Sequence, residues 1–260
     1  MENSIIPSGT VVVGVDGSPS CERALEWAAR HAVLERRQLT LAHGFDPVRP
    51  DGRDHLRRAR ERVREIAPDL AVHEALWPAD PQVTLLDLAE RAALVVVGSR
   101  GRGPMRSVLL GSLGLALARR SRCPLVVVRP GHRGLVRHGV AVGVDGSPGS
   151  RPAVEFAYEQ ASSYGLPLTL LHSGSGAEAE VAVAEAVAGL AEKYPEVRAE
   201  TRIVAEDPAD ALARESHRMD LVVVGAHHGH GLRPSVTSAV LEHAAGPVAV
   251  VPSAMAGSDA

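Results

Sequence analysis

Aromatic residues are scarce in this chain of 260 residues, where Phe, Trp and Tyr together make up 3%. The core must therefore consist of Val, Leu and Ala, and few side chains remain to stack on a nucleic-acid base or a flavin ring. The formal net charge is −3, so the basic excess of most nucleic-acid-binding proteins is missing too. Both shortages count against nucleic acid as a partner and against a flavin-binding electron carrier.

Cysteine is equally rare. Cys21 and Cys123 stand at non-equivalent places in the two halves, which indicates buried thiols in a reducing compartment and not a disulfide framework. No run reaches about 18 apolar residues, so no membrane span is expected. The opening residues, MENSIIPSG, lack a cationic segment, which argues against a signal peptide. We therefore expect a cytoplasmic protein.

The chain repeats one motif. VVVGVDGSP at residues 11–19 returns as VAVGVDGSP at residues 140–148, an offset of 140 − 11 = 129 positions. LTLAH at residues 39–43 returns as LTLLH at residues 168–172, with the same offset. Such a long internal repeat indicates two copies of one domain, and the chain is long enough for two.

We expect the domains at residues 8–130 and 138–253, joined by a linker at residues 130–139. The offset falls to 221 − 94 = 127 at the two LVVVG segments and to 247 − 124 = 123 at the closing prolines. The second copy therefore lacks 127 − 123 = 4 residues, in or near a glycine-rich loop.

Short Val-rich runs alternate with longer amphipathic segments in each half. In the first half the runs cover residues 11–16, 39–43, 71–77, 94–97 and 125–128, and the helix candidates cover residues 21–36, 52–66, 81–91 and 112–122. Short apolar strands indicate burial on both faces, and intervening helices make the strands parallel. The pattern predicts two repeated α/β domains, each with a flavodoxin-like, doubly wound sheet of five parallel strands.

Three helix starts follow from a capping residue placed before a proline. Ser18-Pro19, Asp80-Pro81 and Asp207-Pro208 each combine a side-chain acceptor with a residue whose φ suits the first helical position.

A ligand crevice in such a sheet lies beyond the carboxyl ends of the strands, at the topological switch. Asp16 ends the first strand and Gly98 ends the fourth, so both are expected to face it. Glycines such as Gly98, Gly101 and Gly103 let the backbone approach a bulky anion. The Gly111-Ser112 pair then opens a helix, whose N-terminus favours phosphate.

Arg100, Arg102 and Arg106 add positive charge to the same loop. The loop is not a Walker A sequence, because no Gly-Lys-Ser/Thr follows it. Neither a third Rossmann glycine nor a Gly-x-Ser-x-Gly elbow is present, so hydrolase chemistry has little support.

The pattern Gly98-x2-Gly101-x9-Gly111-Ser112 resembles the ATP-binding signature of the universal stress protein (UspA-like) family. The VGVDGSP opening, the LTLAH strand and the CPLVVV close resemble that family's other landmarks. The resemblance covers nearly the whole chain, once per half, and implies a tandem protein that binds an adenine nucleotide. It implies ATP as the ligand, with or without Mg²⁺.

The resemblance also assigns residues in the first half. Gly14, Val15 and Asp16 are expected at the adenine and ribose, and Gly98 and Gly101 along the ribose and phosphates. Gly111, Ser112 and Leu113 are expected to hold the phosphates. Gly44 stands where the family often has an aliphatic residue against adenine, so that contact is weakened.

The second half departs from the signature. Asp145 matches Asp16, but Pro234 replaces Gly111, and proline removes a backbone N–H and fixes φ. Ser235 still aligns with Ser112. We therefore expect the second nucleotide motif to be degenerate.

Other polar groups have simpler interpretations. His227, His228 and His230 lack a nearby Cys or Glu that would complete a metal site, so a solvated loop is expected. The arginine-rich segment at residues 56–65 reads as an exposed helix face. His43 and His172 end equivalent strands and are expected to be structural.

The resulting hypothesis is an adenine-nucleotide-binding stress-response regulator without a dedicated catalytic apparatus. It would act through nucleotide-dependent conformation or binding of a protein partner. A slow Mg-dependent ATPase using Asp16 and a protein-interaction module without nucleotide are the alternatives. The last strands, at residues 125–128 and 248–251, would be bare sheet edges. In the resembled family they pair between domains, which implies an intramolecular pseudo-dimer and leaves a homodimer open.

Overall fold

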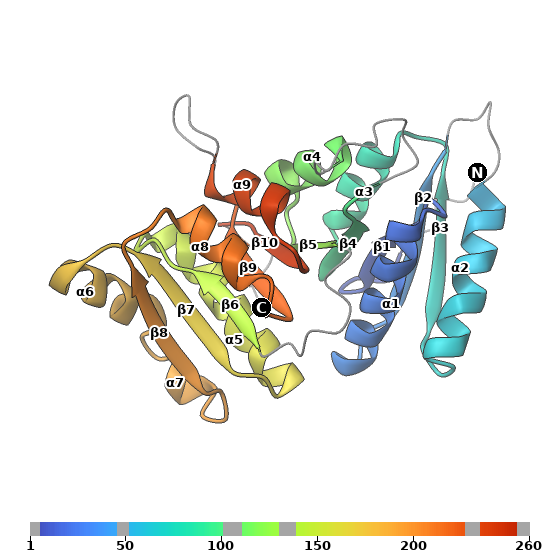
Figure 1. Cartoon of the computed structure of the whole chain (residues 1–260). Coiled ribbons are helices and arrows are strands. Elements are labelled where there is room, and N and C mark those ends of the chain that lie inside the picture. The colour runs from blue at the N-terminus through green and yellow to red at the C-terminus, as the bar shows by residue number, and fades with distance from the viewer. Residues whose placement is uncertain (1–5, 46–51, 101–110, 130–138, 227–234, 254–260) are drawn as a thin grey trace. The chain divides into compact units, whose positions relative to one another are not determined.

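The computed structural model describes residues 6–45, 52–100, 111–129, 139–226 and 235–253. The chain divides into two compact units, Met1–Val128 and Arg129–Ala260, shown in Figure 1.

The first unit is a parallel five-stranded sheet with helices on both faces. Its elements are β1 (Val11–Gly14), α1 (Pro19–Leu34), β2 (Leu39–Gly44), α2 (Gly52–Ile66), β3 (Val72–Trp77), α3 (Pro81–Ala89), β4 (Leu94–Gly98), α4 (Ser112–Arg120) and β5 (Leu125–Val128). The strand order is β3-β2-β1-β4-β5, and every pair is parallel. The order turns back between β1 and β4, where the switch point lies.

The second unit repeats this plan. Its elements are β6 (Val140–Gly143), a 3-10 turn (Pro148–Ser150), α5 (Arg151–Tyr164), β7 (Leu168–Ser173), α6 (Gly176–Val187), α7 (Leu190–Lys193), β8 (Ala199–Val204), α8 (Pro208–Glu215), β9 (Leu221–Gly225), α9 (Val236–His243) and β10 (Val248–Val251). The order is β8-β7-β6-β9-β10, again parallel throughout. Together with the first unit, this confirms the predicted flavodoxin-like α/β fold.

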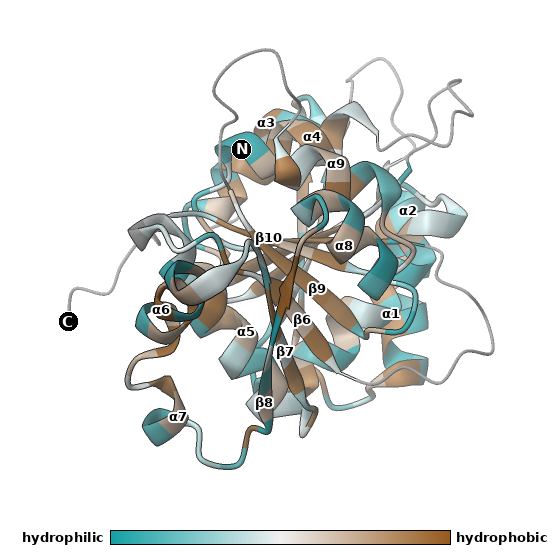
Figure 2. Cartoon of the chain, turned by 60° about the vertical axis from the view of Figure 1, so that its left-hand side comes forward, coloured by the Kyte–Doolittle hydropathy of each residue, from teal (hydrophilic) through white to brown (hydrophobic). Residues whose placement is uncertain are grey.

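The central strands of the sheet consist mainly of buried apolar residues. The central strands β1, β4, β6 and β9 are buried along almost their whole length. In the first unit α1 packs with α2, and α3 packs with α4, so that the two pairs cover opposite faces (Figure 1). Figure 2 shows β6 and β9 largely brown and α2 mostly teal, as expected for a buried sheet under half-exposed helices.

The three predicted caps are confirmed. Ser18 Oγ accepts from the Cys21 amide at 3.2 Å, Asp80 Oδ1 from the Gln82 amide at 2.8 Å, and Asp207 Oδ1 from the Ala209 amide at 2.9 Å. In each case proline occupies the first turn.

The observed bounds in the first unit lie within two residues of the predicted ones, and two differences from prediction have a local cause. The first strand ends at Gly14 and not at residue 16, because the chain turns at Gly17 with φ +70°. The second unit has the extra helix α7, because Gly189 at φ +78° separates it from α6.

Candidate functional site

The turn after β1 presents a carboxylate at the switch point. The Val15 amide donates to the Ala42 carbonyl at 2.8 Å, and His43 Nδ1 donates to the Val15 carbonyl at 2.5 Å. Asp16 Oδ1 accepts from the Ser18 amide at 2.9 Å. Asp16 is half-buried, and its Oδ2 makes no hydrogen bond within the described ranges. One carboxylate oxygen is therefore held by the turn, and the other is available to a ligand.

The end of β4 lies against the start of α1. A side chain at Gly98 would place its Cβ 2.7 Å from the Ser20 carbonyl oxygen, so only glycine fits. The next residue, Ser99, is buried, and its amide donates to the Val128 carbonyl at 3.0 Å. Ser99 Oγ is buried without a hydrogen-bond partner in the described part of the chain. A buried hydroxyl of this kind fits a bound polar group.

Ser18 connects the two loops of the crevice. While its Oγ caps α1, its hydroxyl also donates to the Arg100 carbonyl at 3.3 Å. This bond joins the turn carrying Asp16 to the segment that follows β4. The Arg100 side chain is exposed, so its guanidinium is accessible to an anion.

Helix α4 starts beside the same strand end. The Gly111 amide donates to the Ser99 carbonyl at 3.2 Å. Gly111 is the N-cap and has no side chain to bond the first-turn amides. Ser112 is exposed and Leu113 is half-buried. The N–H groups and the positive end of the helix dipole therefore remain available for an anion.

Gly111 leaves room for a ligand. Among the described residues, a Cβ built on it would meet only the Ser99 carbonyl oxygen, at 3.8 Å. Its φ of −61° is open to any residue. The fold itself therefore does not require glycine here, in contrast to Gly98.

The fold requires glycine at position 44, where the resembled family often has an aliphatic residue. Its Cβ would lie 2.7 Å from the Ala79 carbonyl oxygen and from Thr84 Oγ1, and 2.8 Å from Pro81 Cα. The loop between β3 and α3 occupies the space that an aliphatic side chain would need. At the equivalent place in the second unit, Ser173 donates to the Glu206 carbonyl.

The structure thus gathers most of the predicted site at one edge of the sheet. Three segments contribute: Gly14, Val15 and Asp16 at the end of β1, Gly98 and Arg100 at the end of β4, and Gly111, Ser112 and Leu113 at the start of α4. The bonds Ser18–Arg100 and Gly111–Ser99 connect these segments, and Gly44 ends the neighbouring strand β2. Gly101, Arg102, Gly103 and Arg106 lie outside the described residues.

Sequence reasoning missed Ser18 as a bridge and Ser99 as a candidate ligand contact. From the sequence, Ser18 is predicted only to cap a helix. A signal for Ser99 existed, since a polar residue directly follows the apolar strand and lies inside the glycine pattern.

In the second unit, side chains make hydrogen bonds at the start of the equivalent helix, α9. Ser235 is the N-cap of α9 and not its first helical residue, and its Oγ accepts from the Ser238 amide at 3.2 Å. The Thr237 hydroxyl donates to the Gly225 carbonyl at 2.7 Å. Asp145 keeps the turn bond, with Oδ1 accepting from the Ser147 amide at 2.8 Å, but its side chain is exposed. The α9 end therefore has fewer amides available for a ligand than the α4 end.

The histidines and cysteines have structural surroundings. His172 Nδ1 donates to the Val144 carbonyl at 2.8 Å, which repeats the His43 contact. Both rings are buried and hold the site turns in place. Burial raises the pKa of the Cys21 thiol, and raises that of Cys123 to about 11. Both thiols are therefore protonated at neutral pH.

The described ranges contain no group of three His, Cys, Asp or Glu side chains that could hold a metal ion. The three loop histidines at 227, 228 and 230 lie outside those ranges. Among the helices that the structure describes, none has the length and apolar character needed to cross a membrane.

Comparisons of the sequence and of the structure with known proteins agree on one family. A sequence profile described as "Universal stress protein family" matches residues 8–129 and again residues 137–252. Universal stress protein Rv2005c of Mycobacterium tuberculosis is 34% identical, over 92% of this chain and 96% of its own length. The crystal structure of a universal stress protein from Archaeoglobus fulgidus has a TM-score of 0.69 at 21% identity, covering 95% of this chain and 97% of that one.

A shorter protein was solved as a universal stress protein in complex with cAMP. It is 32% identical, covers 47% of this chain and 98% of its own, and has a TM-score of 0.41. The two profile matches and the full-length relative establish the family: the chain belongs to the universal stress proteins and carries the family's domain twice in tandem.

Proposed function

We propose that the first domain, residues 8–130, binds one adenine nucleotide in the crevice between β1 and β4. The observation that carries this proposal is the start of α4. Its first-turn amides have no side-chain cap, and Gly111 is hydrogen-bonded to Ser99, whose own buried hydroxyl has no partner among the described residues. An uncapped helix N-terminus beside an unsatisfied hydroxyl fits a phosphate-bearing ligand.

Different residues around the crevice would contact different parts of the nucleotide. Asp16 Oδ2 is placed to accept hydrogen bonds from ribose hydroxyls, and Gly14 and Val15 form the wall near the base. Ser112 and the α4 amides would bind phosphate oxygens. Arg100 adds positive charge at the rim. The family resemblance assigns ATP, with or without Mg²⁺, as the nucleotide.

The second domain, residues 138–253, is proposed to leave its equivalent site empty. The Ser235 cap on α9 bonds the amide that a phosphate would need. Pro234, outside the described residues, has no N–H to contribute.

We further propose that the protein acts as a regulator and not as an enzyme. Nucleotide would change the conformation of the first domain or its affinity for a protein partner. Slow ATP hydrolysis is the second candidate, because Asp16 is half-buried and has one carboxylate oxygen unengaged in the described structure. Hydrolysis predicts phosphate release that Asp16→Asn abolishes, whereas regulation predicts binding without turnover.

The test is a calorimetric titration of ATP with Mg²⁺ into the nucleotide-stripped protein, beside Gly111→Ala and Gly111→Pro. The alanine methyl has room in the fold and would occupy the space of the phosphate, so we expect affinity to fall by about tenfold or more, which is about 1.4 kcal/mol. Proline additionally removes the N–H that bonds Ser99.

Unchanged affinity in both variants would place the nucleotide elsewhere. Absence of any heat and of any shift in melting temperature in the parent protein would leave the interaction module without nucleotide as the better account.

A further inference from the structure

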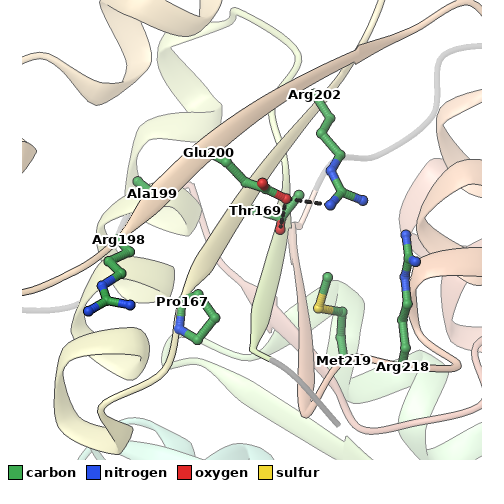
Figure 3. A pocket seen from close by; sticks show the side chains of 8 residues that line it. All are labelled: Pro167, Thr169, Arg198, Ala199, Glu200, Arg202, Arg218 and Met219. Carbon is green, nitrogen blue, oxygen red and sulfur yellow. Dashed lines mark hydrogen bonds and ion pairs between the residues drawn. The ribbon is translucent and has the colours of Figure 1, made fainter.

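A pocket in the second unit lies at the amino ends of that unit's strands. Its volume is about 340 Å³, within the lower range of small-molecule sites. Figure 3 shows the residues around it. Pro167 precedes β7, Ala199 opens β8, and Met219 precedes β9. These are the amino ends of the strands, whereas family nucleotide sites are expected at the carboxyl ends.

The wall of the pocket is charged. Arg198 directly precedes β8, and Glu200 and Arg202 follow it at every second position, so the three side chains share one face of the extended segment. Arg202 Nη2 lies 2.5 Å from Glu200 Oε1, and the Thr169 hydroxyl donates to the same oxygen at 3.2 Å. The dashed lines in Figure 3 mark these two contacts. Glu200 is therefore held within the wall.

A second carboxylate lies behind the arginines. Glu215, at the end of α8, has a side chain that is 4% exposed. Arg218 binds it through both carboxylate oxygens, at 2.8 and 3.0 Å, and Arg202 Nη1 lies 3.6 Å away. A buried carboxylate of this kind restricts the orientation of both guanidinium groups.

The pocket keeps an excess of positive charge. Arg198, Arg202 and Arg218 supply three cations against Glu200 and Glu215, which leaves 3 − 2 = +1. Arg198 is exposed and has no ion pair with any residue that the structure describes. Pro167, Ala199 and Met219 provide apolar surface beside these charges.

The first unit shows that the fold does not need this ion pair. At the offset of 127, Arg202 corresponds to Ala75 and Glu215 to Leu88, since 202 − 127 = 75 and 215 − 127 = 88. Both Ala75 and Leu88 are buried. A buried ion pair gives little net stability compared with apolar residues in its place. The charged set is thus a feature of the second unit that folding alone does not explain.

We propose that this pocket binds a small organic anion that carries one carboxylate or phosphate group on a short aliphatic body. The oxyanion would bind the N–H groups of Arg202 and Arg218 that face the pocket, and Arg198, which lies apart from them beyond Pro167 (Figure 3), would add positive charge at the rim. The aliphatic body would contact Met219 and Pro167. This site is separate from the proposed nucleotide site and goes beyond the proposed function.

Methyl NMR of the full chain labelled at methionine tests the proposal. The chain has four methionines. Met219 lines the pocket, and Met105 belongs to the glycine-rich segment of the first domain, so the two signals distinguish the two sites. The ligands are hexanoate, n-hexyl phosphate and inorganic phosphate, and Met219→Leu assigns the signal.

We expect hexanoate, n-hexyl phosphate or both to shift the Met219 methyl signal in a saturable manner and to leave Met105 unchanged. Their relative affinities distinguish a carboxylate ligand from a phosphate ester. Inorganic phosphate should bind about tenfold more weakly or worse, because it lacks the aliphatic body. Equal affinity for inorganic phosphate would overturn the role given to the apolar surface. No saturable shift of Met219 by about 10 mM of either organic anion would overturn the site itself.

Two variants locate the charge requirement. Arg218→Gln should weaken binding by about tenfold, the usual effect of losing one charge-assisted hydrogen bond. The double variant Arg202→Ala, Glu215→Leu introduces the residues of the first unit and should fold but lose binding. Arg91→Gln, at the first-unit position equivalent to Arg218, is the matched control and should leave affinity unchanged.

Unchanged affinity in Arg218→Gln, or retained affinity in the folded double variant, would overturn the proposal. If the double variant does not fold, Arg218→Gln decides the question by itself.

Discussion

Gly44 and Gly111 are both glycines of the predicted site, but they are needed for different reasons. The Cβ of an alanine at Gly44 would lie 2.7 Å from backbone and side-chain oxygens, whereas at Gly111 the nearest atom of the described residues is 3.8 Å away. We predict that Gly44→Ala lowers the free energy of unfolding by about 1–3 kcal/mol through overpacking. Urea denaturation of the two alanine variants measures this.

Gly111→Ala is the control for that measurement and should leave the free energy of unfolding close to that of the parent protein. Equal destabilisation of both variants would show that steric closure does not distinguish the two positions.

Ser18 is predicted to position the nucleotide crevice. Its Oγ caps α1 and its hydroxyl donates to the Arg100 carbonyl. Ser18→Ala should cost about 1 kcal/mol of stability and also weaken nucleotide binding, because the two loops lose their direct link. Ser18→Thr retains the hydroxyl and should restore affinity.

Ser147→Ala, at the equivalent position of the second unit, is the matched control and should not change nucleotide affinity. A Ser18→Ala protein that loses stability but binds nucleotide as well as the parent would reduce Ser18 to a helix cap.

At the scale of elements, the equivalent helices α1 and α5 carry different polar residues at one buried position. His31 of α1 is buried and stacks on Trp27 with ring centroids 4.9 Å apart, while α5 has the buried Gln160 at the equivalent position, 31 + 129 = 160. Burial lowers the pKa of His31 from 6.5 to about 4, partly opposed by Glu35. The folded protein therefore resists protonation of this ring.

The pH dependence follows from that shift. Between about pH 6.5 and pH 4 the unfolded chain binds a proton that the folded state does not, so stability falls as the pH is lowered through this window. The loss is up to about 3 kcal/mol and is complete below pH 4. His31→Gln should remove this part of the acid sensitivity, as measured by urea denaturation at pH 7 and pH 4.5.

The reciprocal variant Gln160→His provides the control, because it should add acid sensitivity to the second unit. A His31→Gln protein with the same pH dependence as the parent would contradict the prediction.

Most elements could be predicted from local pattern. The range of α2 was predicted to the residue, and α4 starts at Ser112 as expected. The end of β1 and the helix α7 were predicted less well, because they depend on positive φ at Gly17 and Gly189. Glycine accepts this conformation easily, but its presence in a sequence does not require it.

At the scale of the whole molecule, the two copies of one domain differ in function under our proposal. Asp16 and Asp145 make the same turn bond, but α4 starts without a side-chain cap and α9 is capped by Ser235. We predict one nucleotide per chain, with binding lost or strongly weakened in Asp16→Asn and unchanged in Asp145→Asn. Calorimetric stoichiometry and affinity measure both.

Two nucleotides per chain in the parent protein, reduced to one by either substitution, would show that the second site is intact. The Ser235 cap would then have to open when the nucleotide binds.

The sequence by itself determined the repeat, the alternation of strands and helices and the glycine pattern, because each depends on residues close together in the chain. Only the tertiary structure decided that Ser18 bonds Arg100, 82 positions away, that the loop after β3 fills the space at Gly44, and that Arg202 and Glu215 meet at a pocket. These contacts join segments far apart in the chain, and no local pattern encodes which side chains will meet across a folded sheet.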